Sequence, residues 1–106
     1  MNEFINFIGI CKKSGKISLG YDACLKAVKK NKSCLVLYTK DLSERSLRKF
    51  QDESEHSDIK GMVVDLKMED FYIIFKKSVG IISINDKSLA RKVEKLYVKM
   101  QGGCSL

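Results

Sequence analysis

The sequence predicts an α/β protein built as a three-layer α/β/α sandwich, with helices on both faces of a four-stranded mixed sheet. Apolar runs of strand length alternate along it with segments in which apolar residues recur at helical spacing. The chain has 106 residues, of which 44% are hydrophobic, so it can bury one core but is short for two domains. We therefore expect residues 1–101 to form a single domain and residues 102–106 a flexible tail.

The first half of the chain predicts two helices around a short strand. The first helix has an apolar face at Phe4, Ile5, Ile8 and Cys11, and the glycine at position 15 is expected to end it. A strand over residues 16–19 follows, and a helix runs from Gly20 to about residue 31. Apolar side chains recur along one side of that helix at Tyr21, Cys24 or Leu25, and Val28. Its other side carries charges at Asp22, Lys26 and then Lys29 or Lys30.

The second half predicts three strands, each followed by a helix. The continuous apolar run 34–38 is typical of a buried central strand, and residues 59–66 and 79–84 supply the other two. Asp41 and Glu44 fit a capping box before a helix of about a dozen residues. The next helix carries an apolar stripe at Met68, Phe71, Tyr72 and Phe75. The last begins at a cap in residues 85–86 and has its stripe at Leu89, Val93, Leu96 and Met100.

Charge is distributed unevenly along the chain. Residues 1–40 carry eight lysines and two acidic side chains, residues 41–75 have a net charge of −4, and residues 76–106 one of +5. The two basic segments would form one patch only if they met in space. Such a patch would suit a polyanion, and we place nucleic acid ahead of an anionic membrane and of a solvated surface that binds nothing.

The junction at Gly20 is the candidate binding feature of the sequence. A glycine turn there would leave backbone N–H groups at the positive end of a helix, which is an anion site. Asp22 and Lys26 permit two interpretations. They can form an intrahelical i,i+4 salt bridge, or the carboxylate can accept hydrogen bonds from a guanine edge while the lysine neutralises a phosphate.

The remaining composition favours a cytoplasmic protein without a metal, a cofactor or a catalytic centre. The four cysteines include no C-x-x-C pair, so we expect three buried thiols and a tail thiol at Cys104. His56 is the single histidine and lies in an acidic, polar segment, where we expect it on the surface. No apolar run approaches membrane-spanning length. Cys24 is expected to be buried; a reactive thiol there would point to an enzyme.

The order of elements, with Gly20-x-Asp22-x-x-x-Lys26 at the first strand-to-helix junction, resembles the kink-turn RNA-binding family of small ribosomal proteins. That family includes the archaeal L-seven-Ae protein, the eukaryotic L-thirty-e protein and bacterial members of the YlxQ type, which this chain resembles most. The resemblance rests on residues 8–16, 20–22, 35–43 and 82–92, which together span nearly the whole chain.

The resemblance implies binding of structured RNA through the start of the second helix and two neighbouring loops, residues 77–80 and 39–41. Gly20 would let a phosphate approach, Asp22 would match the family's guanine-contacting residue, and Lys26 its basic residue one turn on. Strong kink-turn binders usually have Glu where this chain has Ala23. In chain order, the residues expected to contact RNA are Lys16, Gly20, Asp22, Lys26, Lys29, Lys40, Lys77, Ser78 and Val79.

These observations support three function classes in order. The first is a non-enzymatic RNA-binding protein, ribosomal or ribosome-associated, that recognises kink-turn-like RNA. The second is a protein–protein interaction module on the same scaffold, for which the acidic segment 52–58 offers a separate surface. An enzyme comes third, because the sequence offers no base beside a nucleophile.

Overall fold

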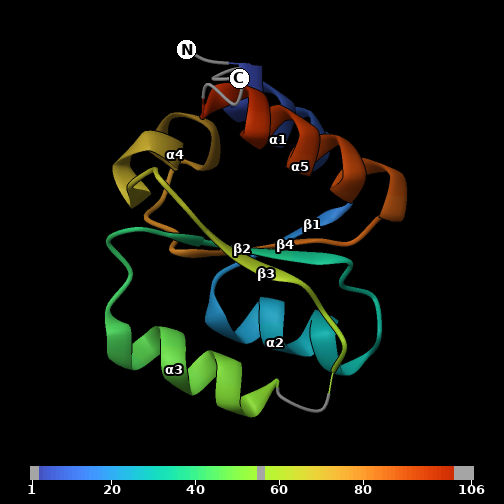
Figure 1. The fold of residues 1–106 in the computed structure, drawn as a ribbon, viewed down its shortest axis with the longest axis vertical. Helices are drawn as coiled ribbons and strands as arrows, with labels where there is room; N and C mark the ends of the chain where they lie inside the picture. Colours follow the sequence, from blue (N-terminus) through green and yellow to red (C-terminus); the bar gives the residue numbers. More distant parts are fainter. Residues whose placement is uncertain (1–2, 55–56, 102–106) are drawn as a thin grey trace.

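The structure, a computed structural model, describes residues 3–54 and 57–101. Five helices and four strands alternate along these residues (Figure 1). In chain order they are α1 (Glu3–Lys13), β1 (Ile17–Leu19), α2 (Tyr21–Lys29), β2 (Leu35–Thr39), α3 (Glu44–Glu53), β3 (Gly61–Val64), α4 (Met68–Phe75), β4 (Ile81–Ile84) and α5 (Lys87–Met100). The predicted alternation of helices and strands is therefore confirmed.

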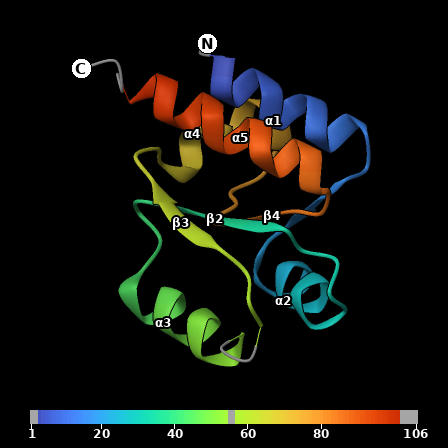
Figure 2. The ribbon, with the colours of Figure 1, turned by 45° about the vertical axis from the view of Figure 1, so that its right-hand side comes forward.

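The four strands form one mixed sheet between two helical layers. The strand order is β1-β4-β2-β3, with β4 antiparallel to both of its neighbours and β2 parallel to β3. Helices α1, α4 and α5 cover one face of the sheet, and α2 and α3 cover the other (Figures 1 and 2). This is the predicted three-layer α/β/α sandwich.

Strand β2 lies at the centre of the core because both of its faces are covered. Leu35 and Leu37 pack into the cluster beneath α1, α4 and α5, whereas Val36 and Tyr38 pack into the cluster beneath α2 and α3. Successive side chains of a strand point to opposite faces, so a strand buried on both reads as a continuous apolar run. The interpretation of residues 34–38 as a central strand is thus confirmed.

One local prediction is wrong, the capping box at the start of α3. The N-cap residue is Ser43, whose hydroxyl oxygen accepts a hydrogen bond from the backbone N–H of Ser46 at 3.1 Å. Asp41 instead accepts from the backbone N–H of Met68 at 3.0 Å, at the start of α4. Both Ser43 and Asp41 are good capping residues, and the partner of Asp41 lies too far along the chain for a local pattern to identify.

The thiols are placed nearly as expected. Cys11 and Cys24 are buried, and burial raises their pKa values to about 11 and about 12, which keeps both protonated at neutral pH. Cys34 is only partly buried, which corrects the expectation that it belongs to the core. The predictions for His56, for Cys104 and for the tail at 102–106 fall outside the described residues.

Within residues 3–54 and 57–101, no helix has both the length and the apolar character that crossing a bilayer requires.

Candidate nucleic-acid interface

One edge of the sheet gathers chain segments that are far apart in sequence. Strands β1, β2 and β3 end there and β4 begins there, as their pairing directions require. Backbone hydrogen bonds join the segments, including one from the N–H of Gly20 to the carbonyl of Ile81 at 2.9 Å and one from the N–H of Thr39 to the carbonyl of Gly80 at 3.0 Å. Loops at strand ends are common binding sites in α/β sheets, so we call this region the binding edge.

Helix α2 begins at the binding edge with unpaired backbone donors. Its N-cap residue, Gly20, has φ +90° and ψ 167°, a conformation essentially limited to glycine, and it offers no side chain to cap the helix. Among the described residues none accepts a hydrogen bond from the N–H groups of residues 21–23. Space beside Gly20 is open, because a Cβ built there would meet no atom within 4 Å. An anion can therefore reach these donors.

Three of the predicted residues form one exposed stripe along α2. Asp22, Lys26 and Lys29 are exposed and follow one another at helical spacing. No ion pair between Asp22 and Lys26 occurs in the part of the chain that the structure describes, which is against the salt-bridge interpretation. Asp22 stands in the first turn, whereas Lys26, one turn further along, and Lys29 stand in the last, so of the three only Asp22 is at the start of the helix.

Tyr21 fixes the start of α2 to helix α3. Its ring packs edge-on against Phe50 with centroids 5.3 Å apart, and its hydroxyl donates a hydrogen bond to the carboxylate of Glu53. Burial, helped by that hydrogen bond, raises the pKa of Tyr21 to about 12, so the hydroxyl stays a donor at neutral pH. These contacts hold the first turn of α2 in place on a packed layer.

The loop between α4 and β4 also lies at the binding edge, but its side chains are not all available. Lys77 and Ser78 are exposed, whereas Val79 is only 3% exposed and packs into the core. The side chain of Val79, which the sequence analysis places among the RNA contacts, therefore faces inward and is not available to a ligand. A Cβ at Gly80 would approach Leu42 Cδ1 and Met68 Cε to 2.9 Å, so the neighbouring loops are tightly packed there.

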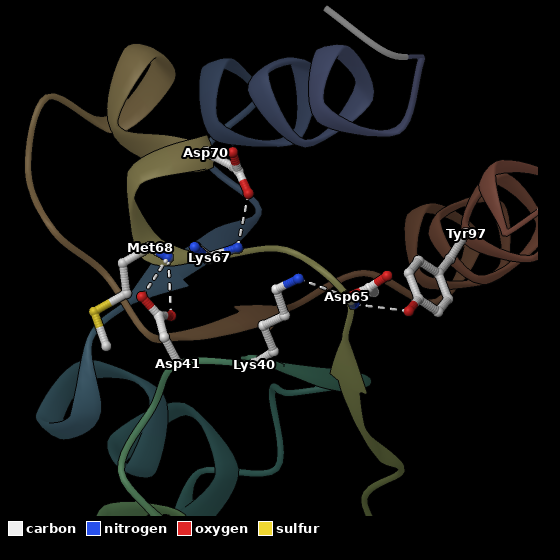
Figure 3. A network of polar contacts seen from close by, with 7 residues as sticks. All are labelled: Lys40, Asp41, Asp65, Lys67, Met68, Asp70 and Tyr97. Carbon is white, nitrogen blue, oxygen red and sulfur yellow. Dashed lines mark hydrogen bonds and ion pairs between the residues drawn. The ribbon is translucent and has the colours of Figure 1, made fainter.

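Lys40 lies at the binding edge but is already paired. Its ammonium group is 2.9 Å from a carboxylate oxygen of Asp65, and the hydrogen bond and charge of Asp65 raise the pKa of Lys40 (Figure 3). Figure 3 also shows the backbone N–H of Asp65 donating to the hydroxyl of Tyr97 at 2.8 Å. The contact network thus holds the end of β3 rather than leaving Lys40 free for a ligand.

Lys16 does not belong to the binding edge. It precedes β1, and its carbonyl accepts a hydrogen bond from the N–H of Asn85, which follows β4, so it lies at the opposite end of these two strands. The pKa of Asp86 is lowered by hydrogen bonds from Leu89 and Ser88 and further by the charge of Lys16. Lys16 therefore lies near the start of α5 and not near Gly20.

Two further lysines, which the sequence analysis did not assign to the site, are at the binding edge. Lys67 precedes α4, and Lys76 ends it with φ +60°; both are exposed, and neither forms an ion pair with another described residue. The parallel pairing of β2 and β3 brings Lys67 to the same end as Lys40. A sequence signal existed for Lys76, since it stands beside Lys77 in the basic turn.

A buried hydroxyl at the binding edge gives a stability prediction. Thr39 is 2% exposed, and its Oγ1 has no hydrogen-bond partner among the described residues. Replacing it with valine removes an unsatisfied polar atom and keeps the shape, so we expect the free energy of unfolding to stay equal or to rise by up to about 1 kcal/mol, measured by urea denaturation. The matched control is Ser83→Ala, because the buried Ser83 hydroxyl is hydrogen-bonded to Ser33 and Asn85, each at 2.7 Å. The control should lose about 1–3 kcal/mol, and a similar loss in Thr39→Val would contradict the assignment.

The described residues contain no cluster of three or more histidine, cysteine, aspartate or glutamate side chains that could hold a metal ion. What the binding edge offers is an anion-accepting helix start, a free carboxylate at Asp22 and several free ammonium groups. Such a set suits a ligand that combines phosphates with hydrogen-bond donors.

The fold places this chain among small α/β/α sandwiches with a mixed four-stranded sheet. It is similar to a protein of unknown function from Bacillus halodurans C, with a TM-score of 0.80 at 21% sequence identity, over 92% of this chain and 98% of that one. It is also similar to the Giardia lamblia 15.5kD RNA binding protein, with a TM-score of 0.68 at 15% identity, over 96% of this chain and 91% of that one. No protein-family model and no curated protein matches the sequence. At these identities the similarity establishes the fold alone.

Proposed function

We propose that this protein is a non-enzymatic RNA-binding protein that recognises structured, kink-turn-like RNA through the start of α2 and the loop before β4. The observation that carries the proposal is the start of α2, where residues 21–23 present unpaired N–H groups beside an exposed carboxylate and an exposed lysine. The Giardia protein of similar fold, which is named as RNA-binding, supports the same class of ligand.

Each group at the helix start has a distinct role in this proposal. The N–H groups and the positive end of the helix dipole would bind a phosphate, and Gly20 leaves the space for it. The Asp22 carboxylate would accept hydrogen bonds from the N1–H and N2–H₂ donors of a guanine. Lys26 would neutralise a neighbouring phosphate one helical turn away.

A bulged or kinked RNA fits this arrangement better than a regular duplex. The deep major groove of A-form RNA excludes side chains, whereas unstacked bases in a bulge expose their edges. The residue after Asp22 is Ala23, so guanine recognition by the first turn of α2 would rest on the carboxylate of Asp22. The partner would be ribosomal RNA or another kink-turn-like RNA, with the protein acting on or near the ribosome in the cytoplasm.

The proposal includes no catalytic step. Of the described residues, the fully buried thiols Cys11 and Cys24 have raised pKa values and are not poised as nucleophiles.

A second candidate function, a protein–protein interaction module, is favoured by exposed apolar side chains on α1 and α4, where Ile10 is 56% and Ile73 is 57% exposed. Absence of binding to any RNA at low salt would favour that candidate.

The proposal is tested by comparing a kink-turn RNA with a duplex of equal length. In Asp22→Ala we expect the preference for the kink-turn RNA to fall about tenfold, because one guanine contact is lost. In Lys26→Ala we expect weaker binding of both RNAs and a salt dependence reduced by about one phosphate contact. Electrophoretic shift across a salt series measures both.

The matched control for the first variant is Asp58→Ala, which removes one exposed carboxylate from the loop before β3 and makes the same change in net charge. It should keep the full preference for the kink-turn RNA. Equal preferences in Asp22→Ala and Asp58→Ala would overturn the role of Asp22.

A further inference from the structure

Helix α5 carries a second basic surface. Arg91, Lys92 and Lys95 are exposed on its outer side, and we call these three residues the α5 ridge. With Ser88 and Leu96 they line a shallow groove of about 340 Å³. The opposite side of the helix packs on the sheet through Ala90 and Val93. The proposed function does not use this surface.

Of the acidic residues near the α5 ridge, Asp58 lines a hollow beside Arg91, and two others are paired with lysines outside the ridge. Glu94 forms an ion pair with Lys60 at 2.8 Å, and Glu3 forms one with Lys99 at 3.3 Å. The three ridge cations form no ion pair with any residue in 3–54 or 57–101. The ammonium group of Lys92 lies 5.0 Å from the centre of the Phe7 ring on α1, a cation–π contact that orients it. The ridge therefore keeps its positive charge.

The α5 ridge lies on a different layer of the molecule from the start of α2. Helix α5 covers one face of the sheet and α2 covers the other, with the sheet between them (Figures 1 and 2). The molecule measures 34 × 31 × 28 Å along its principal axes. A nucleic acid held at the start of α2 would reach the ridge only by passing around the protein.

We propose that the α5 ridge is a second RNA-contacting surface, so that the protein bridges two RNA segments. This inference rests on the proposed function, which supplies the first segment. Cations one helical turn apart are about 6 Å apart along the axis, and a duplex presents a dense row of phosphates to them. The ridge itself consists of three cations, and none of its side chains is a carboxylate or an aromatic ring that could read a base. It would therefore bind the phosphate backbone independently of sequence.

Lys16 lies on the same side as the start of α5. Its charge reaches Asp86, the residue that caps α5, and it lies away from the binding edge. Lys13 is exposed in the last turn of α1 and adds a further cation to the layer that α1 forms with α4 and α5. The basic residues of the chain thus divide between two sides of the molecule.

The test uses a plain 20-base-pair RNA duplex as the probe. In the variant Arg91→Gln/Lys92→Gln/Lys95→Gln we expect the salt dependence of duplex binding to fall by about three phosphate contacts, and affinity at low salt to fall about tenfold or more. The matched control is Arg45→Gln/Arg48→Gln/Lys49→Gln on α3, which removes three exposed cations and makes the same change in net charge. The control should bind the duplex like the wild type.

Bridging is measured by energy transfer between a donor-labelled kink-turn RNA and an acceptor-labelled duplex. The wild type should bring the labels together, and the ridge variant should lose that signal while still binding the kink-turn RNA.

Equal salt dependence of duplex binding in the ridge and control variants overturns the inference and leaves the proposed function intact. If the ridge variant loses duplex binding and the wild type shows no preference for the kink-turn RNA, the first result supports the ridge as an RNA-contacting surface and the second overturns the proposed function. Ridge-dependent binding to vesicles containing phosphatidylglycerol, without duplex binding, overturns the inference in favour of a membrane surface.

Discussion

Replacing Phe50 with alanine is expected to lower the free energy of unfolding by about 3–5 kcal/mol. Phe50 is completely buried and is the one buried side chain of α3. Its ring packs against Tyr21 and Tyr38, with centroid distances of 5.3 Å and 5.9 Å. Truncation would leave a cavity and free α3 from the sheet. Urea denaturation followed by circular dichroism measures the change.

The control for this prediction is Tyr72→Ala, in which an aromatic side chain that is 53% exposed is removed from α4. We expect it to change the free energy of unfolding by less than about 1 kcal/mol. If Phe50→Ala lowered the free energy of unfolding as little as Tyr72→Ala, the description of α3 as packed on the sheet would be wrong. The support that Tyr21 gives to the start of α2 through Phe50 would then be wrong as well.

Replacing Gly20 with alanine is expected to lower the free energy of unfolding by about 1–3 kcal/mol and to remove most of the preference for kink-turn RNA. A Cβ at this position meets no atom, so the stability cost arises from the backbone, which has φ +90° and ψ 167°. A residue that avoids this conformation would turn the first N–H groups of α2 away from the ligand. Thermal unfolding and electrophoretic shift together measure the two effects.

Gly15→Ala is the matched control, because Gly15 also has a positive φ, +74°, and open space around its Cα. It ends α1 and lies away from the binding edge, so it should lose stability but keep the RNA preference. If the two variants lost the preference equally, reduced stability and not the local geometry of Gly20 would explain the loss.

The fold was predictable because its elements have strong local patterns. The run 34–38 has no polar interruption, as expected for a strand buried on both faces. Helix α5 keeps its apolar spacing over 14 residues. The pattern around Asp41 was ambiguous because Ser43 is an equally good cap, and the real partner of Asp41 is the N–H of Met68. Long-range partners of this kind are set by how strands pair and cannot be read from neighbours in sequence.

The candidate site was predictable only in part, for a similar reason. Gly20 and Asp22 lie at the start of one helix and Lys26 follows one turn after Asp22, so their proximity follows from local structure. Lys16 is almost as near in sequence, but the three-residue strand β1 places it about 10 Å away at the other end. Val79 reads as an apolar loop residue, and only the packing of the core shows that its side chain is buried.

The division of the basic residues was also beyond the sequence. Residues 1–40 and 76–106 both carry excess positive charge, which by itself allows one shared patch. The sheet instead separates α2 from α5, because the connections place the two helices on opposite faces (Figure 1). Handedness and strand order decide this, and neither is visible in a charge pattern.

The measurement that tests the central claim most directly is a titration of the ¹⁵N-labelled protein with a kink-turn RNA, followed by amide chemical shifts. The claim predicts that the largest changes fall on residues 20–26, where the N–H groups of residues 21–23 gain a hydrogen-bond acceptor, and on the loop 76–80. Changes confined to α5, or none at all at low salt, would contradict the claim that RNA binds at the start of α2.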